Sequence, residues 1–573
     1  MLIRADALYS ALLSDLSLVI DPSLPGWSSD STIQQAAAYC LRDSLLKKFR
    51  FSDEPSKSAC DSALKKFLAV NKSCADWKPL WNTSLDEMLI GEVKLVIDKF
   101  WYGRDGISPI VSDLREVYLE GRAGPGASIS ARDTDFYTKM FDSPLSATGN
   151  LPELWERCVS ISGLSFLAEA SRLVAYGYNV VEASRYSFVH KTQTVARGIC
   201  TEPSINMWFQ LGMGRMLEKR LKSFFGIDLA TQPDINRELA RAGSINGHLC
   251  TVDLESASDS LGLGMLEEML PRTFLSTLKM FRCPKTILPS GSELALNMIS
   301  TMGNGYTFPL QTMLFAAVVT GVANYCLKDG TLKNRLDKSS FGVFGDDIIC
   351  PSSIYPRVLR VLTLLGFNVN ASKTFVEGPF RESCGADFFS GSNVRGVYIK
   401  SLRTQQDLFV AINSLNLWSA KTGISLRSTI HLLLSGVKRI FYVPLDESDD
   451  AGIKTPLFLT SSIKRTKQGA ALYRYWAPQE YAFYILGDCV WTFRDQVRRS
   501  YNSYGLYISF LGGYIRGSRI LLRQRRVRYR TRQKITPRWD YLPPRPLEGL
   551  FGPQGFRRFV DAWKRNLFGY VSL

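Results

Sequence analysis

Two adjacent carboxylates flanked by apolar residues are the most distinctive chemical feature of this sequence. Phe341 to Cys350 reads FGVFGDDIIC, in which β-favouring residues surround Gly-Asp-Asp. The pattern predicts a tight hairpin that carries Asp346 and Asp347 at its tip. Gly-Asp-Asp is also ordinary surface-turn chemistry. The apolar residues on both sides favour a site beside a core, where an unpaired charge is costly unless a metal binds it.

A second acid has similar surroundings. Leu249 to Asp259 reads LCTVDLESASD, a short β-type run that ends in Asp253. An acid in this position can also serve only as the N-cap of a following helix. Two acid-tipped strands together favour a shared site for two Mg²⁺ ions, since oxygen ligands suit this hard cation. Two such ions about 3.5–4 Å apart stabilise the attacking and leaving oxygens of a phosphoryl displacement.

A glycine-rich segment lies between the two acidic motifs. Ser300 to Gln311 reads STMGNGYTFPLQ and leads into a charge-free apolar stretch. Gly303 allows close backbone approach to a substrate, and Ser300 and Asn304 offer hydrogen bonds. The alternative is a simple turn before a core helix.

The charge of the chain favours polyanionic partners. Its 70 Lys and Arg residues against 53 acids give a net charge of +17, which favours nucleic acid, with an acidic membrane surface or acidic partner as alternatives. The 11 cysteines form no Cys-x-x-Cys pair and only three histidines are present, so we expect reduced thiols and no zinc site.

No membrane segment is expected. The first 20 residues lack an uninterrupted apolar core, so they are not expected to be a signal peptide. The apolar stretch from Met313 to Leu327 is shorter than the ~20 residues that a membrane span needs. It is predicted to be a buried core helix.

The remaining organisation follows from periodicity. Apolar residues at helical spacing predict helices in 32–49, 85–100 and 205–224, and residues 185–200 are β-like. Residues 245–400 alternate short strands and helices. Helices are expected to dominate beyond residue 400, up to a cationic segment at 516–538.

Six blocks of this sequence, taken in order, resemble the replicase β subunit of RNA bacteriophages of the levivirus type. They are VHKTQTVARGICTEPSINMWFQLGMG, LCTVDLESASDS, STMGNGYTF, FGDDIICPS, the KTF of 373–375 and GPFRESCGADFFSG. These blocks are similar to polymerase motifs F, A, B, C, D and E. The resemblance covers residues 120 to 400, about half of the chain.

The resemblance implies an α+β right-hand fold of fingers, palm and thumb, with an antiparallel palm sheet packed on helices. Within the resemblance, 121–244 would be fingers with a basic triphosphate-binding motif, and 245–400 would be a palm with the catalytic carboxylates. Outside it, 1–120 is predicted to be a helical N-terminal region of the fingers, and 401–573 a thumb and basic C-terminal region.

The resemblance also implies a role for each site residue. Asp253, Asp346 and Asp347 would hold two Mg²⁺ ions, and Lys373 would protonate the departing pyrophosphate. The nucleotide-binding set would be Lys191, Arg197, Asp259, Ser300, Gly303 and Asn304. In this set, Lys191 and Arg197 hold the triphosphate, whereas Asp259 and Asn304 sense the ribose 2′-OH.

Two departures from the family pattern bear on these roles. Thr194 stands where relatives carry a further Lys, so triphosphate binding would depend on Lys191, Arg197 and Arg185. Asp259 follows Asp253 by six positions rather than five, and Ser258 takes the expected place. Gln311 is the rival of Asn304 for the 2′-OH.

The predicted function is RNA-directed RNA polymerase, copying a single-stranded viral RNA genome without a primer. The implied partners are template and product RNA, ribonucleoside triphosphates, host elongation factors Tu and Ts and a host ribosomal protein, in the cytoplasm of an infected bacterium. The alternatives are a reverse transcriptase and a non-catalytic basic RNA-binding protein. Gly345 before the acid pair and small Ser256 and Ser258 after Asp253 disfavour the reverse transcriptase.

A cationic C-terminal segment lies outside the resemblance. Ten Lys and Arg residues and no acids occur between Arg516 and Arg538. Strict alternation from Arg526 to Ile535 predicts a strand with one basic face, formed by Arg526, Arg528, Arg530, Arg532 and Lys534. This face is predicted to bind RNA; the alternatives are an edge strand protected by its charges and a disordered basic tail.

Overall fold

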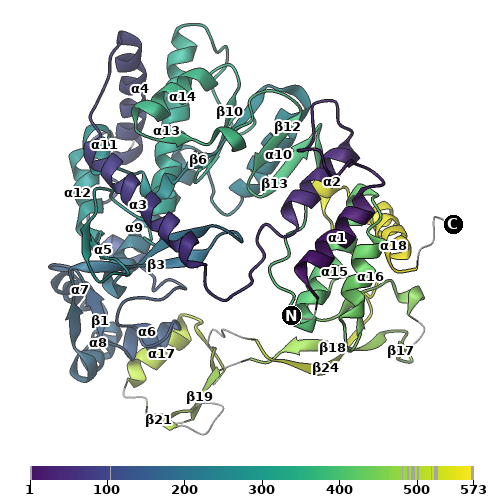
Figure 1. Ribbon diagram of the computed structural model, residues 1–573. Helices are drawn as coiled ribbons and strands as arrows, with labels where there is room; N and C mark the ends of the chain where they lie inside the picture. Colours follow the sequence, from purple (N-terminus) through teal and green to yellow (C-terminus); the bar gives the residue numbers. More distant parts are fainter. Residues whose placement is uncertain are drawn as a thin grey trace.

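Segments far apart in the sequence pair to form the central sheet of the computed structural model (Figure 1). The structure describes residues 3–103, 105–460, 463–480, 482–486, 489–491, 497–499, 502–517, 519–521 and 527–568. The central sheet has the order β5-β10-β9 and is antiparallel. Its strands are β5 (Leu249–Val252), β9 (Gly342–Phe344) and β10 (Asp347–Pro351). The predicted hairpin around the acid pair is therefore present.

A long apolar helix forms the core behind this sheet. By length and composition α13 (Thr307–Lys328) could cross a membrane, but most of it is buried inside the protein. It is apolar on all sides because other helices surround it. These are α4 (Ser84–Trp101), α9 (Ser204–Phe224) and α14 (Tyr355–Leu364). The prediction of a buried core helix is confirmed.

A second sheet, with the order β4-β3-β7-β8, carries the predicted basic segment. Its strands are β3 (Ala183–His190), β4 (Ala196–Thr201), β7 (Lys285–Ile287) and β8 (Glu293–Ala295). Helix α3 (Lys57–Asp76) packs on it through Phe67, which contacts Tyr186 with ring centroids 4.7 Å apart.

Further helices and short strands connect these two sheets or pack beside them. Before the central sheet they are α5 (Leu114–Leu119), α6 (Phe136–Phe141), β1 (Leu145–Ala147), α7 (Leu151–Val159), α8 (Gly163–Tyr176), β2 (Tyr178–Val180) and α10 (Gln232–Asn246). Within and after it they are β6 (Leu254–Glu255), η1 (Ala257–Asp259), α11 (Leu263–Met269), α12 (Arg272–Phe281), β11 (Asn368–Val369) and η2 (Ala371–Lys373).

A separate core forms where the first helices of the chain meet later ones. Figure 1 shows α1 (Ala5–Leu16) and α2 (Ile33–Ser44) beside α15 (Gln405–Thr422) and α16 (Arg427–Ser435). The sheet β12-β13-β14 adjoins this core, and α18 packs on α15. These elements are β12 (Phe380–Ser383), β13 (Ala386–Phe389), β14 (Ser392–Asn393) and α18 (Gly552–Phe568).

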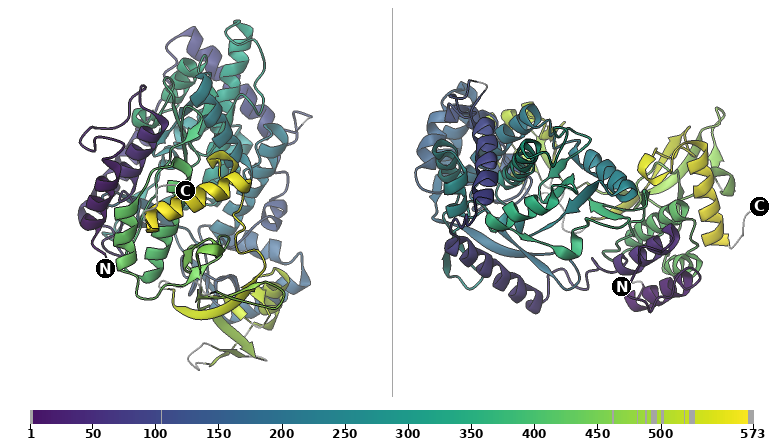
Figure 2. Two further views of the ribbon diagram at one scale, coloured as in Figure 1. Left: turned by 90° about the vertical axis from the view of Figure 1, so that its right-hand side faces the viewer. Right: turned by 90° about the horizontal axis from the view of Figure 1, so that it is seen from above.

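The first 120 residues therefore pack in three places rather than forming a unit of their own. α1 and α2 join the core of α15 and α16, α3 covers the β3–β4 hairpin, and α4 packs on α13. Seen from above, the purple N-terminal helices again lie in separate places (Figure 2). The division of the chain into fingers, palm and thumb stays a prediction.

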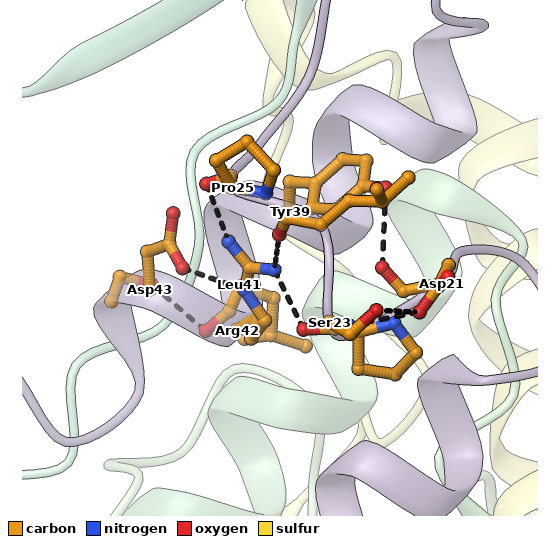
Figure 3. Close-up of polar contacts among 10 residues, drawn as sticks. Asp21, Ser23, Pro25, Tyr39, Leu41, Arg42 and Asp43 are labelled. Atoms are coloured by element: carbon orange, nitrogen blue, oxygen red, sulfur yellow. Dashed lines mark hydrogen bonds and ion pairs between the residues drawn. The ribbon is translucent and has the colours of Figure 1, made fainter.

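An arginine fixes the loop between α1 and α2. The guanidinium of Arg42 donates to the main-chain oxygens of Pro22, Leu24 and Pro25 at 3.0, 2.5 and 2.9 Å (Figure 3). The loop then brings Trp27 onto Phe380 of β12, with ring centroids 4.6 Å apart.

The prediction of mainly helical structure beyond residue 400 is wrong after residue 435. Two sheets, β17-β18-β24 and β21-β20-β19-β23-β22, contain most of the described elements there. Their strands are β17 (Lys464–Arg465), β18 (Ala471–Pro478), β19 (Ala482–Leu486), β20 (Cys489–Trp491), β21 (Val497–Arg499), β22 (Ile515–Arg516), β23 (Arg519–Leu521) and β24 (Tyr529–Thr536). Besides α18, the other elements are β15 (Tyr442–Val443), β16 (Ile453–Lys454), η3 (Leu457–Leu459), α17 (Ser503–Leu511) and η4 (Pro546–Glu548).

The predicted basic strand is present as β24, at the edge of its sheet. Arg530 and Arg532 lie in the strand and are exposed, and Arg528 precedes it. Arg526 lies outside the described residues. Lys534 pairs with Glu447 at 3.0 Å, so one cation of this face is already neutralised. The position of the strand at a sheet edge is confirmed. RNA binding by its basic face and protection of the edge by its charges both stay predictions.

The close packing of α4 on α13 gives a first testable prediction. A Cβ added to Gly321 of α13 would lie 2.8 Å from the Cα of Val93, a main-chain atom that cannot move aside. Gly321→Ala should therefore lower the free energy of unfolding by about 1–3 kcal/mol. Gly91→Ala in α4 is the matched control, because an added Cβ there meets nothing within 4 Å. It should raise the free energy of unfolding by about 0.4–1 kcal/mol. Equal effects in urea denaturation would show that these helices do not pack this closely.

Candidate active site

The tip of the β9–β10 hairpin is built to carry an acid. Its two turn residues are Gly345 and Asp346, and only Gly345 has a positive φ, +64°, as in a type II′ turn. A Cβ at Gly345 would lie 2.3 Å from Cε2 of Phe308. The Gly345 N–H donates to Oγ1 of Thr312 at 3.0 Å. The first turns of α13 therefore pack directly against the turn of the hairpin.

The strand register brings the predicted carboxylates together. Ile348 pairs with Val252, so the next residues, Asp347 and Asp253, face each other across the sheet. Asp346 adjoins them at the tip of the hairpin. The N–H of Cys384 donates to Oδ2 of Asp347 at 3.2 Å. Three acids from two strand ends thus meet at one edge of the sheet.

Burial and the repulsion of neighbouring carboxylates destabilise the charged forms of Asp346 and Asp347. Burial raises the pKa of Asp347 to about 6, and the charges of Asp346 and Asp253 add to this effect. Burial also raises the pKa of Asp346, assisted by the charge of Asp253. The Nζ of Lys373 lies 3.8 Å from Oδ1 of Asp253. This ammonium group opposes part of the carboxylate charge.

The donor set is chemically suited to Mg²⁺, which prefers carboxylate oxygens. In the described parts of the chain, however, no three Asp, Glu, His or Cys side chains are arranged closely enough to hold a metal as they stand.

Basic residues face the acids from the second sheet. Lys191 follows β3, and Arg197 lies in β4 opposite Val189. Burial lowers the pKa of Lys191, and the charges of Arg197 and Lys373 lower it further, while Asp253 opposes this change. Lys191, Arg197 and Lys373 therefore gather beside the carboxylates, where they could hold a polyphosphate.

Arg185 does not join this group. It pairs with Thr201, four residues along β3 from Val189, which is about 13 Å. Thr194 lies in the exposed loop between β3 and β4. The predicted contribution of Arg185 to the triphosphate site is not supported by this geometry.

The glycine-rich segment is held close to the β4 strand and to Asp259. Gly303 has φ +121°, and a Cβ there would lie 2.2 Å from the main-chain oxygen of Cys200. The N–H of Met302 donates to Oδ1 of Asp259 at 3.1 Å. Burial raises the pKa of Asp259 to about 6. Ser300 has a buried hydroxyl oxygen without a hydrogen-bond partner among the described residues.

Asn304 and Gln311 remain rivals for the ribose. Oδ1 of Asn304 accepts from the N–H of Tyr306 at 3.0 Å, and the Asn304 side chain also interacts with the phenol of Tyr306. Oε1 of Gln311 accepts from the hydroxyl of Ser258 at 3.3 Å. Only 2% of Gln311 is exposed, against 9% of Asn304, so Asn304 is the more accessible of the two.

Sequence reasoning missed two residues that organise the site. Asn370 donates to Oδ2 of Asp253 at 2.8 Å. Arg381 is fully buried and donates only to main-chain oxygens, including that of Leu249 in β5 at 2.7 Å. β12 reads FRES, so its pattern did not mark Arg381 as a buried residue. The sequence carried no signal for Asn370 either.

The basic face of β24 is not part of this constellation. Figure 1 shows β24 at the bottom of the molecule, far from β10 near the top.

Comparison with known proteins identifies the family. Residues 4–440 match the family model described as RNA replicase, beta-chain. The chain belongs to this family. It is 38% identical over 302 residues to the RNA-directed RNA polymerase beta chain of Escherichia phage MS2, covering 52% of this chain and 53% of that protein. It is 42% identical over 237 residues to the RNA-directed RNA polymerase subunit beta of Escherichia virus Qbeta, covering 41% and 38%.

The matches span about half the length of these relatives or less. Among solved structures, an RNA polymerase complex inside a dsRNA virus is similar with a TM-score of 0.38 and 12% identity, covering 67% of this chain and 36% of that one. A likeness this low carries no argument about fold or function.

Proposed function

We propose that this chain is the catalytic subunit of an RNA-directed RNA polymerase that copies a single-stranded phage RNA without a primer. The observation that carries the proposal is the meeting of Asp253, Asp346 and Asp347 at one sheet edge, opposite Lys191 and Arg197. Membership of the replicase beta-chain family supports it. The proposal includes a right-hand arrangement, with fingers in 121–244, palm in 245–400 and thumb after 401.

The residues divide the work of nucleotidyl transfer. Two Mg²⁺ ions, held by the three carboxylates, would supply charge stabilisation of the attacking and leaving oxygens. Lys191 and Arg197 bind and orient the triphosphate of the incoming nucleotide. Lys373 gives a proton to the leaving pyrophosphate oxygen.

The segments around the acids select the sugar. Asp259, which accepts from the N–H of Met302, and Asn304 form hydrogen bonds with the ribose 2′-OH. Ser300 and Gly303 shape the backbone beside them.

Further parts of the proposal concern the setting. The substrates are ribonucleoside triphosphates and an RNA template, and the chain works in the cytoplasm of an infected bacterium. Host elongation factors Tu and Ts and a ribosomal protein are proposed partners. The alternatives are a reverse transcriptase and a non-catalytic RNA-binding protein. The following experiments would reveal either of them if the proposal is wrong.

The central test removes one carboxylate. Asp346→Asn and Asp253→Asn should each abolish nucleotide addition on an RNA template while leaving RNA binding nearly intact, because the metal loses a charged ligand. Asp347→Asn should be milder, since only one of two adjacent acids can point optimally at the ions. Asp61→Asn, which neutralises an exposed acid of α3, is the matched control and should retain full activity. Retention of more than about a tenth of wild-type activity by Asp346→Asn would refute the metal assignment.

A second prediction decides between the rival ribose contacts. If Asn304 donates to the 2′-OH, Asn304→Ala should lower kcat/KM for ribonucleotides and narrow the preference over deoxynucleotides. One hydrogen bond corresponds to about 1–3 kcal/mol, or about five- to a hundred-fold. Gln311→Ala should leave the ribo/deoxy ratio unchanged. The reverse result would assign the role to Gln311.

A third prediction concerns the basic edge strand. Each single-strand phosphate contact contributes a salt slope of roughly 0.7. Changing Arg528, Arg530 and Arg532 to Ala should therefore flatten the plot of log K against log[salt] for RNA binding by up to about 2. The triple Arg→Lys variant keeps the charges and should keep the slope. An unaltered slope in the Ala variant would mean that β24 does not touch RNA.

A further inference from the structure

The carboxylate of Asp253 is held by a short segment in which a role has been predicted for Lys373 alone. Residues 370–374 follow β11, which pairs with β6 directly after Asp253. The N–H of Asn370 donates to the main-chain oxygen of Asp253 at 2.9 Å. The side-chain amide of Asn370 donates to Oδ2 of Asp253 at 2.8 Å. Oγ1 of Thr374 accepts from the N–H of Asp253 at 3.3 Å.

The orientation of the Asn370 amide follows from its partners. A carboxylate only accepts hydrogen bonds, so the NH₂ group of Asn370 must face Asp253. Its Oδ1 then accepts from the hydroxyl of Ser372 at 2.8 Å. Both ends of the amide are used, which fixes the side chain in one position.

We infer that Asn370 is a positioning residue for Asp253. By holding Oδ2, it sets the rotation of the carboxylate and leaves Oδ1, on the side of Lys373, as the oxygen available to a cation. The inference rests on the proposed function, since it concerns the same site. Partners that orient a metal ligand in this way commonly affect metal affinity by about 10–100-fold.

The same segment links Asp253 to the proposed proton donor. The N–H of Lys373 donates to the main-chain oxygen of Asn370 at 3.0 Å. Asn370 therefore sets the position of Asp253 through its side chain and that of Lys373 through its main chain. A change to the side chain alone should disturb the acid and spare the lysine.

The test compares metal binding with activity in Asn370→Ala. The dissociation constant for Mn²⁺, measured by electron paramagnetic resonance on the protein without substrates, should rise about 10–100-fold. The Mg²⁺ concentration that gives half-maximal nucleotide addition should rise by a similar factor. At saturating Mg²⁺, KM for the nucleotide should stay near its wild-type value, because Lys191 and Arg197 are unaltered.

Two further variants make the result decisive. Asn368→Ala removes an exposed asparagine side chain two residues upstream in β11 and should bind Mn²⁺ as the wild type does. Ser372→Ala removes the hydroxyl that orients the Asn370 amide and should weaken Mn²⁺ binding in the same direction by a smaller factor. If Asn370→Ala does not fold, Ser372→Ala decides: weaker binding supports the inference and wild-type binding overturns it.

The outcomes separate this inference from the proposed function. Wild-type Mn²⁺ binding by a folded Asn370→Ala overturns the role of Asn370. If Asp253→Asn is then inactive in nucleotide addition, only the positioning role of Asn370 has failed. If Asp253→Asn remains active, the proposed function has failed and the inference with it.

Discussion

The structure depends on placing three mutually repelling carboxylates at the end of a buried sheet. Two unit charges 4 Å apart interact by about 4 kcal/mol at the effective dielectric of a protein surface. The pairing of β5 with β10 opposes this repulsion, because Val252, Ile348 and Cys350 are almost fully buried. Leu249 and Ile349 are buried in a second cluster on the opposite face, so a slip of one residue would move the side chains of both strands into the wrong cluster. The hydrophobic register therefore fixes the electrostatic geometry.

Some of the positive charge of the chain is structural rather than available for RNA. Arg381 is fully buried, and its donors reach the main-chain oxygens of Leu249 and Val376, both at 2.7 Å. Arg42 likewise donates to main-chain oxygens, in the loop before α2. An arginine has five N–H groups in a rigid fork, so it can satisfy carbonyls that no helix or sheet pairs. A net charge of +17 thus overstates the basic surface available to a polyanion.

The sequence was sufficient where structure depends on local pattern and insufficient where it depends on distant main-chain atoms. The hairpin at Asp346 and the helix α13 follow from turn chemistry and from an unbroken apolar run. Apart from β24, which was predicted, the strands after residue 435 were missed, and most of them are only two to five residues long. Asn370 and Arg381 were missed because their partners, Asp253 and Leu249, lie more than a hundred positions away. The apolar face of a helix such as α1 predicts that it packs against another element. It does not predict that this element is α16.

The dispersal of the N-terminal helices has a consequence for the site itself. The segment after α2 meets the tip of the β3–β4 hairpin, where the N–H of Gln193 donates to the main-chain oxygen of Lys47 at 2.9 Å. Burial lowers the pKa of the neighbouring Lys48, and the charges of Arg395 and Arg197 contribute to this effect. A neutral main-chain hydrogen bond contributes about 1 kcal/mol, whereas cations gather on both sides of the contact and repel one another. An anion between them would reverse that repulsion. The segment after α2 and the tip of the β3–β4 hairpin therefore meet among the same cations that would hold a polyphosphate. A bound polyphosphate would stabilise this contact through those cations.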